Sequence, residues 1–174
     1  RQHLMSVLNE AVDIDDRPTV IRYSKDPMPD DICVVASHDG LDVLRDGPED
    51  GILLVAHGQL CAQALAAVDQ LDAPVRVVSP RWSLPVCEGL IEEAANARAV
   101  VSVEDGLVVS GLGSHLADAL SERGVWRPIR NLGIPQRYLD HDSRSAIMAE
   151  LGLDARGIAD AVSQLVTQFG SASS

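Results

Sequence analysis

Along most of the chain, short apolar runs alternate with longer segments whose apolar residues recur at helical spacing. Residues 52–56, Ile-Leu-Leu-Val-Ala, form a continuous apolar run, which is typical of a strand covered on both faces. Leu60, Ala64 and Val68 follow at the spacing of one helical face. This order recurs, and it predicts an α/β fold with a parallel sheet, right-handed crossovers and helices on both faces. The predicted strands are residues 42–45, 52–56, 75–78, 99–103 and 128–132, and the predicted helices are 59–71, 86–95, 114–123, 143–151 and 154–168.

The first forty residues do not follow this alternation. Leu4, Leu8 and Ala11 predict a helix, and residues 19–23 predict a strand. Residues 26–31, Asp-Pro-Met-Pro-Asp-Asp, pair prolines with acidic residues and therefore predict a linker. The expected organisation is the end of a preceding domain at residues 1–25, a linker at 26–40, the α/β domain at 41–170 and a disordered tail at 171–174.

Composition indicates one core built from aliphatic side chains. Hydrophobic residues make up 46% of the chain but aromatic residues only 3%, so Val, Leu, Ile and Ala must fill the interior, as in parallel sheets and the helices that cover them. A chain of 174 residues is long enough for one domain that buries roughly 70% of its unfolded surface.

The charge balance narrows the possible partners. The formal net charge is −12, and the arginines are scattered among acidic residues, which excludes a nucleic-acid surface of clustered basic residues. No apolar run approaches the roughly 20 residues that a membrane helix needs, and the start shows no signal-peptide pattern, so we expect a cytoplasmic protein without a membrane partner. The three cysteines, Cys33, Cys61 and Cys87, are predicted to be reduced thiols, with Cys61 buried as a small apolar residue.

Four short motifs follow strand-like runs in a fixed order. They are residues 80–85 (Pro-Arg-Trp-Ser-Leu-Pro), 103–106 (Val-Glu-Asp-Gly), 111–114 (Gly-Leu-Gly-Ser) and 131–135 (Asn-Leu-Gly-Ile-Pro). Further matches are residues 18–25 (Pro-Thr-Val-Ile-Arg-Tyr-Ser-Lys), 138–141 (Tyr-Leu-Asp-His) and 150–154 (Glu-Leu-Gly-Leu-Asp). Together they resemble the C-terminal end of the 1-deoxy-D-xylulose-5-phosphate synthase family, thiamine-diphosphate enzymes related to transketolase. The resemblance runs from near Asn9 to about Val162, and its last motifs distinguish this family from the 2-oxo-acid dehydrogenase beta subunits.

The resemblance implies a particular version of the α/β fold. It is a three-layer α/β/α sandwich of the transketolase C-terminal type, with a five-stranded, mostly parallel sheet, one antiparallel edge strand and strand order 1-3-2-4-5. Residues 1–25 would then end a pyrimidine-binding-type middle domain. Strands 52–56 and 99–103 would lie side by side with their crossovers leaving in opposite directions, a place where doubly wound sheets hold ligands beyond the carboxyl ends of their strands.

A possible anion crevice lies at that strand reversal. Glycines ahead of a helix N-terminus let backbone amides face an anion, so the hypothesis is a phosphate or carboxylate site. The alternative is that the two glycines permit a tight turn and close packing while the following serine caps the helix. The residues concerned are His57, Gly58, Glu104, Gly111, Gly113 and Ser114.

Glu104 and Asp105 are adjacent carboxylates at the end of a predicted strand. A strand sends neighbouring side chains to opposite faces, so the two make a poor acid–base pair. We interpret them as structural or domain-contacting residues, as the resemblance also implies.

Lys25 is the one candidate for substrate binding. The resemblance implies an Arg-(Tyr or Phe)-Pro-(Arg or Lys)-Gly segment whose second basic residue binds the phosphate of glyceraldehyde 3-phosphate. Lys25 stands at that position, but Ser24 and Asp26 replace the proline and the glycine. The alternative is a solvated lysine in a linker.

The resemblance also implies a cofactor that this chain is not expected to bind. The family holds thiamine diphosphate through Mg²⁺ on a Gly-Asp-Gly…Asn motif, whereas the Asp-Gly pairs here, such as Asp39-Gly40 and Asp105-Gly106, have no preceding glycine. The five histidines show no spacing for a zinc site, and no P-loop or Gly-x-Ser-x-Gly elbow is present. We therefore expect no catalytic residue, no metal and no turnover in the chain alone.

Three functional hypotheses follow. The first is the C-terminal domain of a homodimeric synthase that condenses pyruvate with glyceraldehyde 3-phosphate, with loss of carbon dioxide, for isoprenoid, thiamine and pyridoxal synthesis. The second is a stand-alone, non-catalytic dimerisation or anion-binding module of the same fold. The third is the C-terminal domain of a transketolase or of a 2-oxo-acid dehydrogenase beta subunit.

Overall fold

A computed structural model describes residues 2–21 and 31–169. The chain divides into two compact units, Arg1–Cys33 and Val34–Ser174. Within the first unit, helix α1 spans Gln2–Asp13, which confirms the helix predicted from the apolar spacing. The strand predicted at residues 19–23 is wrong for 19–21, which form no regular structure, while 22 and 23 lie outside the described residues. A strand is stabilised by pairing with a neighbour, and the side chain of Val20 is 86% exposed.

The second unit holds the remaining helices and strands. Each strand from β3 to β5 is followed by a helix, and β6 is followed by two, as the alternation of patterns predicted. The strands are β1 (Ala36–His38), β2 (Leu41–Arg45), β3 (Ile52–Ala56), β4 (Val75–Pro80), β5 (Ala99–Leu107) and β6 (Ile129–Ile134). The helices are α2 (Leu60–Val68), α3 (Glu88–Asn96), α4 (Leu112–Glu122), α5 (Arg144–Glu150) and α6 (Ala155–Phe169).

The sheet confirms the predicted strand order. Its order is β1-β2-β4-β3-β5-β6, in which β3 pairs in parallel with both β4 and β5, and β6 pairs in parallel with β5. β2 pairs antiparallel with β4. The crossover from β3 leads to β4 on one side and that from β5 leads to β6 on the other, so the predicted strand reversal lies between β3 and β5.

The sheet has six strands where five were predicted, because β1 adds an edge beyond β2. β1 lies within the segment expected to be a linker. Asp39 and Gly40, both with positive φ (45° and 80°), form the two-residue turn between β1 and β2. An Asp-Gly pair is a preferred sequence for this kind of hairpin turn, so the signal was present in the sequence.

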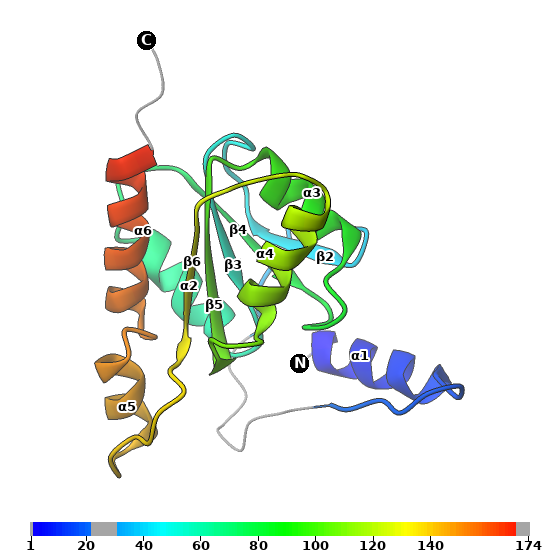
Figure 1. Cartoon of the computed structure of the whole chain (residues 1–174). Helices are drawn as coiled ribbons and strands as arrows, with labels where there is room; N and C mark the ends of the chain where they lie inside the picture. Colours follow the sequence, from blue (N-terminus) through cyan, green and yellow to red (C-terminus); the bar gives the residue numbers. More distant parts are fainter. Residues whose placement is uncertain (1, 22–30, 170–174) are drawn as a thin grey trace. The chain divides into compact units, whose positions relative to one another are not determined.

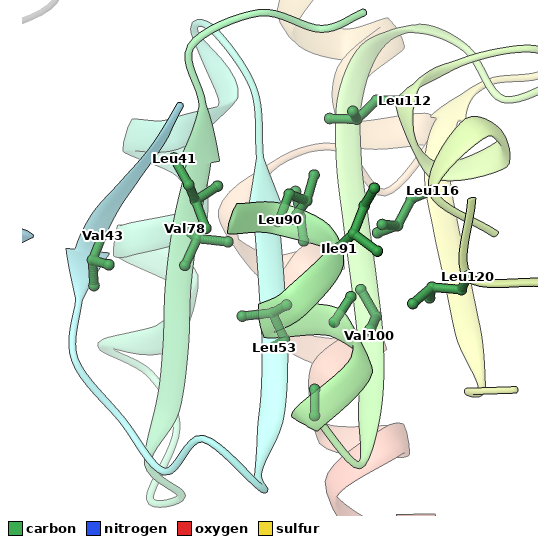
Figure 2. Packing of buried hydrophobic residues seen from close by; sticks show 13 residues of the cluster. Leu41, Val43, Leu53, Val78, Leu90, Ile91, Val100, Leu112, Leu116 and Leu120 are labelled. Carbon is green, nitrogen blue, oxygen red and sulfur yellow. The ribbon is translucent and has the colours of Figure 1, made fainter. Parts of the chain in front are cut away.

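The helices cover the sheet in two layers, with α3 and α4 on one face and α2 and α6 on the other (Figure 1). In β3, Leu53 and Val55 pack into the apolar cluster under α3 and α4, whereas Leu54 between them is directed to the other face. Figure 2 shows this cluster, to which α4 contributes Leu112, Leu116 and Leu120. Apart from Cys61, the buried hydrophobic residues are all aliphatic, as the composition predicted.

Candidate functional site

The carboxyl ends of β3 and β5 lie next to each other at the strand reversal. The chain turns from β3 into α2 through His57 and Gly58, and the His57 amide donates to the Val103 carbonyl oxygen at 3.2 Å. Gly58 has a φ of +64°, a conformation that side chains other than glycine rarely adopt. The Gly58 carbonyl accepts a hydrogen bond from the Cys61 amide in the first turn of α2.

Glu104 closes the N-terminus of α4. Its Oε2 accepts a hydrogen bond from the Leu112 amide at 3.1 Å, and its Oε1 accepts one from the Gly113 amide at 3.4 Å. The first amides of a helix lack partners within the helix and carry partial positive charge, so a carboxylate is a favourable acceptor there. The two amides that the anion hypothesis offered to a ligand therefore bind the chain's own carboxylate.

Two glycines make this approach possible. A Cβ atom on Gly111 would overlap the Glu104 carboxylate and crowd the Leu107 carbonyl oxygen. A Cβ atom on Gly113 would overlap Ser102 Oγ and Asn131 Oδ1. The Gly-x-Gly motif thus allows close packing, which was one of the two interpretations drawn from the sequence.

The cap predicted at Ser114 is wrong. The residue at the N-cap position of α4 is Gly111, in an extended conformation without a side-chain cap of its own. The Ser114 hydroxyl instead donates to the Val108 carbonyl oxygen at 2.7 Å and so holds the loop between β5 and α4. Glu104, eight residues before Leu112, supplies the capping group that a serine at the N-cap would otherwise provide.

Ser102 and Asn131 belong to the same cluster, although neither was a candidate from the sequence. The Ser102 hydroxyl, almost fully buried, donates to Asn131 Oδ1 at 2.8 Å and joins β5 to β6. Gly133 in β6 permits the same close packing, since a Cβ atom there would lie 2.9 Å from the Gly106 carbonyl oxygen. These contacts account for much of the Asn-Leu-Gly motif at residues 131–133.

Asp105 makes its contact on the other side of β5. The pairing of β5 with β6 is irregular between Val103 and Leu107, and Glu104 and Asp105 contact different helices there, Glu104 the start of α4 and Asp105 the start of α5. Asp105 Oδ2 accepts a hydrogen bond from Arg144 Nη2 at 2.9 Å, and the same nitrogen donates to Gln59 Oε1 at 3.3 Å. Arg144, the first residue of α5, was not singled out from the sequence.

These contacts show that the motif residues pack against one another within one domain. Glu104, Gly111, Gly113 and Ser114 come together around the N-terminus of α4. His57 and Gly58 lie at the end of the neighbouring strand, and their part in an anion crevice stays a prediction. Lys25 lies outside the described residues, and so does the tail 171–174.

The comparison with family models agrees with this architecture. Residues 41–158 match the model described as "Transketolase, C-terminal domain". The chain belongs to the transketolase C-terminal domain family. The match begins at the first residue of β2 and ends in α6, so it covers most of the six-stranded sheet and its helices.

Curated relatives of this transketolase C-terminal domain are 1-deoxy-D-xylulose-5-phosphate synthases. The chain is 91% identical over 169 residues to the enzyme of Cutibacterium acnes, covering 97% of this chain and 27% of the relative. It is 44% identical to 1-deoxy-D-xylulose-5-phosphate synthase 2 of Streptomyces avermitilis, with 93% of this chain and 26% of the relative covered. The chain therefore spans about a quarter of the length of the curated relatives it matches.

Solved structures show the same fold. One is described as a split-gene transketolase, an inactive beta4 tetramer, with a TM-score of 0.64 and 30% identity over 78% of this chain and 44% of that one. Transketolase from Leishmania mexicana matches with a TM-score of 0.52 and 18% identity over 78% of this chain and 19% of that one, a likeness of fold alone.

Across residues 2–21 and 31–169, no three His, Cys, Asp or Glu side chains gather where they could hold a metal ion. Glu104 and Asp105, the most conspicuous carboxylates at the strand ends, are directed to backbone amides and to an arginine. No helix in these two ranges has the length and apolar character needed to cross a membrane.

The thiols match the sequence prediction. The structure shows no disulfide bond at Cys33, Cys61 or Cys87. Cys61 is buried in α2, where its thiol donates to the Ala56 carbonyl oxygen at 3.5 Å and its sulfur lies 3.4 Å from Ser79 Oγ. Burial raises the pKa of the Cys61 thiol and so favours the uncharged form, as expected of a core residue.

Proposed function

We propose that the chain is the C-terminal domain of a 1-deoxy-D-xylulose-5-phosphate synthase. The observation that carries this proposal is the 91% identity to the Cutibacterium acnes enzyme, which extends over 97% of the chain but only 27% of that enzyme. Identity to the split-gene transketolase is 30%, which favours the synthase over a transketolase as the parent.

The part played by this domain is structural. At the carboxyl ends of β5 and β3, Glu104 binds the α4 amides, and Asp105 and Gln59 both bind Arg144. The remaining domains of the parent would bind the substrates and the cofactor.

The parent reaction joins pyruvate to glyceraldehyde 3-phosphate and releases carbon dioxide. Thiamine diphosphate, held with Mg²⁺ by the other domains, supplies the carbanion chemistry of such enzymes. The product is a precursor for isoprenoids, thiamine and pyridoxal, and we propose a cytoplasmic homodimer as the working form.

Lys25 would contribute the one substrate contact from this chain. A lysine ammonium is a suitable point charge for a phosphate, and Lys25 is the only lysine in the sequence. We propose that it binds the phosphate of glyceraldehyde 3-phosphate as part of the end of the middle domain.

A domain exchange tests the proposal. The matching quarter of the Cutibacterium acnes enzyme is replaced by this chain, and formation of 1-deoxy-D-xylulose 5-phosphate is measured from pyruvate and glyceraldehyde 3-phosphate. We expect activity comparable with that of the unmodified enzyme, because 91% of the aligned residues are identical.

Two controls make the exchange decisive. The enzyme truncated before this region should be inactive, and a graft of the corresponding Leishmania mexicana transketolase domain, only 18% identical to this chain, should not restore activity. A folded, cofactor-loaded exchange protein that forms no product would refute the proposal.

A further inference from the structure

The segment between β6 and α6 is less buried than α2, α3, α4 and α6, the helices that cover the sheet. We call residues 135–151 the strap; it includes α5 and is drawn from yellow to orange in Figure 1. No residue of the strap is buried, and α5 contributes none to the core. The neighbouring α4, in contrast, buries Leu112, Leu116 and Leu120. The hydrophobic effect therefore does little to hold the strap in place.

Both ends of the strap are fixed. On one side, Ile134 of β6 pairs with Leu107 of β5. On the other, Leu153 is fully buried, and Gly152 packs so closely against Gly157 at the start of α6 that a Cβ atom on Gly157 would overlap it. The strap is therefore a loop whose ends are held by strand pairing on one side and by close packing against α6 on the other.

The strap is also ordered internally by polar contacts. The Ser143 hydroxyl caps α5 by accepting a hydrogen bond from the Ala146 amide at 3.2 Å. Arg137 and Glu150 form an exposed ion pair at 3.4 Å that joins the beginning and the end of the segment. These contacts would survive a movement of the strap as one body.

Arg144 links the middle of the strap to the sheet. It donates to Asp105 beyond the core of β5 and to Gln59 at the start of α2. A basic residue in the first turn of a helix is unfavourable with the helix dipole. The contacts of Arg144 outside α5, rather than the stability of the helix itself, therefore explain why an arginine stands at this position.

We propose that the strap is a mobile cover over the carboxyl ends of β5 and β3, closed by a polar latch of Arg144 with Asp105 and Gln59. The strap opens as one unit while the sheet and α6 remain folded. An exposed ion pair contributes little stability and is screened by salt. The strap should therefore open easily, and the stability of its closed state should fall as ionic strength rises. This inference concerns the chain's own conformations and stands independently of the proposed enzyme activity.

Hydrogen exchange of the 174-residue chain, followed by mass spectrometry, tests the latch. In Arg144→Gln and Asp105→Asn, exchange of peptides from residues 135–151 should accelerate about two- to five-fold, the range expected for loss of one exposed ion pair. Peptides from β3 and from α6 should keep their wild-type rates. In 1 M NaCl the wild-type strap should exchange faster, and the Arg144→Gln strap should change little.

Arg123→Gln is the matched control. Arg123 forms an exposed ion pair with Glu88 between two helices that are both anchored in the core. This variant should leave exchange of the strap unchanged, and the double variant Asp105→Arg with Arg144→Asp should restore the wild-type rate. Equal exchange rates of the strap in wild type and in Arg144→Gln would overturn the latch. If exchange in Arg144→Gln accelerated in the sheet as well as in the strap, the proposal that the strap opens independently would be wrong.

Discussion

Two helices begin close to the end of β5, and they are held in different ways. α4 places Leu112, Leu116 and Leu120 in the aliphatic cluster, and its first amides bind Glu104. α5 has no fully buried residue and reaches the sheet through the arginine at its first position. The first arrangement resists local opening because apolar area would be exposed, whereas the second can open at low cost.

The two adjacent carboxylates at the end of β5 bind two different helices. Glu104 and Asp105 are both acidic, but Glu104 contacts the first amides of α4 and Asp105 contacts the first residue of α5. Glu104 meets backbone amides in a region packed around glycines, and Asp105 meets a half-exposed guanidinium. Packing around each contact, rather than charge, decides how firmly each helix is held.

The largest expected effect comes from removing the apolar anchor of α4. Leu116→Ala should lower the free energy of unfolding by about 3 kcal/mol, because Leu116 is fully buried and its truncation leaves a cavity. Ile147→Ala, a similar truncation on half-buried α5, should cost less than about 1 kcal/mol. Urea unfolding followed by circular dichroism measures both. Equal losses in the two variants would contradict the distinction between the two helices.

An intermediate effect is expected at the glycine packing around Glu104. Gly113→Ala should destabilise the domain by about 1–3 kcal/mol, because the added methyl group would overlap the hydrogen-bonded Ser102 and Asn131. Gly106→Ala is the control, since its methyl group would approach only the end of the Glu104 side chain, at 3.1 Å. Thermal unfolding of both proteins gives the comparison, and a Gly113→Ala variant as stable as the wild type would argue against tight packing there.

The smallest effect is expected of Arg144→Gln on the alkylation rate of Cys61, because Cys61 lies in the core and not in the strap. Its raised pKa lowers the thiolate fraction at any given pH, and burial blocks the reagent, so alkylation by iodoacetamide should be far slower than at exposed Cys33. Arg144→Gln should leave the Cys61 rate unchanged, as measured by mass spectrometry of the labelled peptides. A clear acceleration in that variant would mean that the strap and the core open together.

Much of the fold could be predicted because strands and helices here carry different apolar patterns. The continuous run Ile52–Ala56 and the helical spacing of Leu60, Ala64 and Val68 gave the elements and, with the family resemblance, the strand order. β1 was missed because Ala36–His38 has no apolar pattern and is defined by the turn that follows it.

The site was less predictable than the fold. The sequence placed Glu104 near the glycines, but it could not show that the carboxylate would fold back onto amides eight and nine residues later. Such a contact depends on the length and path of the loop between β5 and α4. Arg144 was missed for the same reason, since its partners Asp105 and Gln59 are 39 and 85 residues away in the chain.

The hairpin formed by β1 and β2 also bears on solubility. Without β1, the edge of the sheet would be β2, a strand of four buried residues and one half-buried residue whose unpaired amides and carbonyls could join the sheet of another molecule. β1 covers this edge with only three residues, Ala-Ser-His, and exposes a short, polar border instead. β1 thus keeps the buried strand β2 from becoming an edge at which a second molecule could extend the sheet.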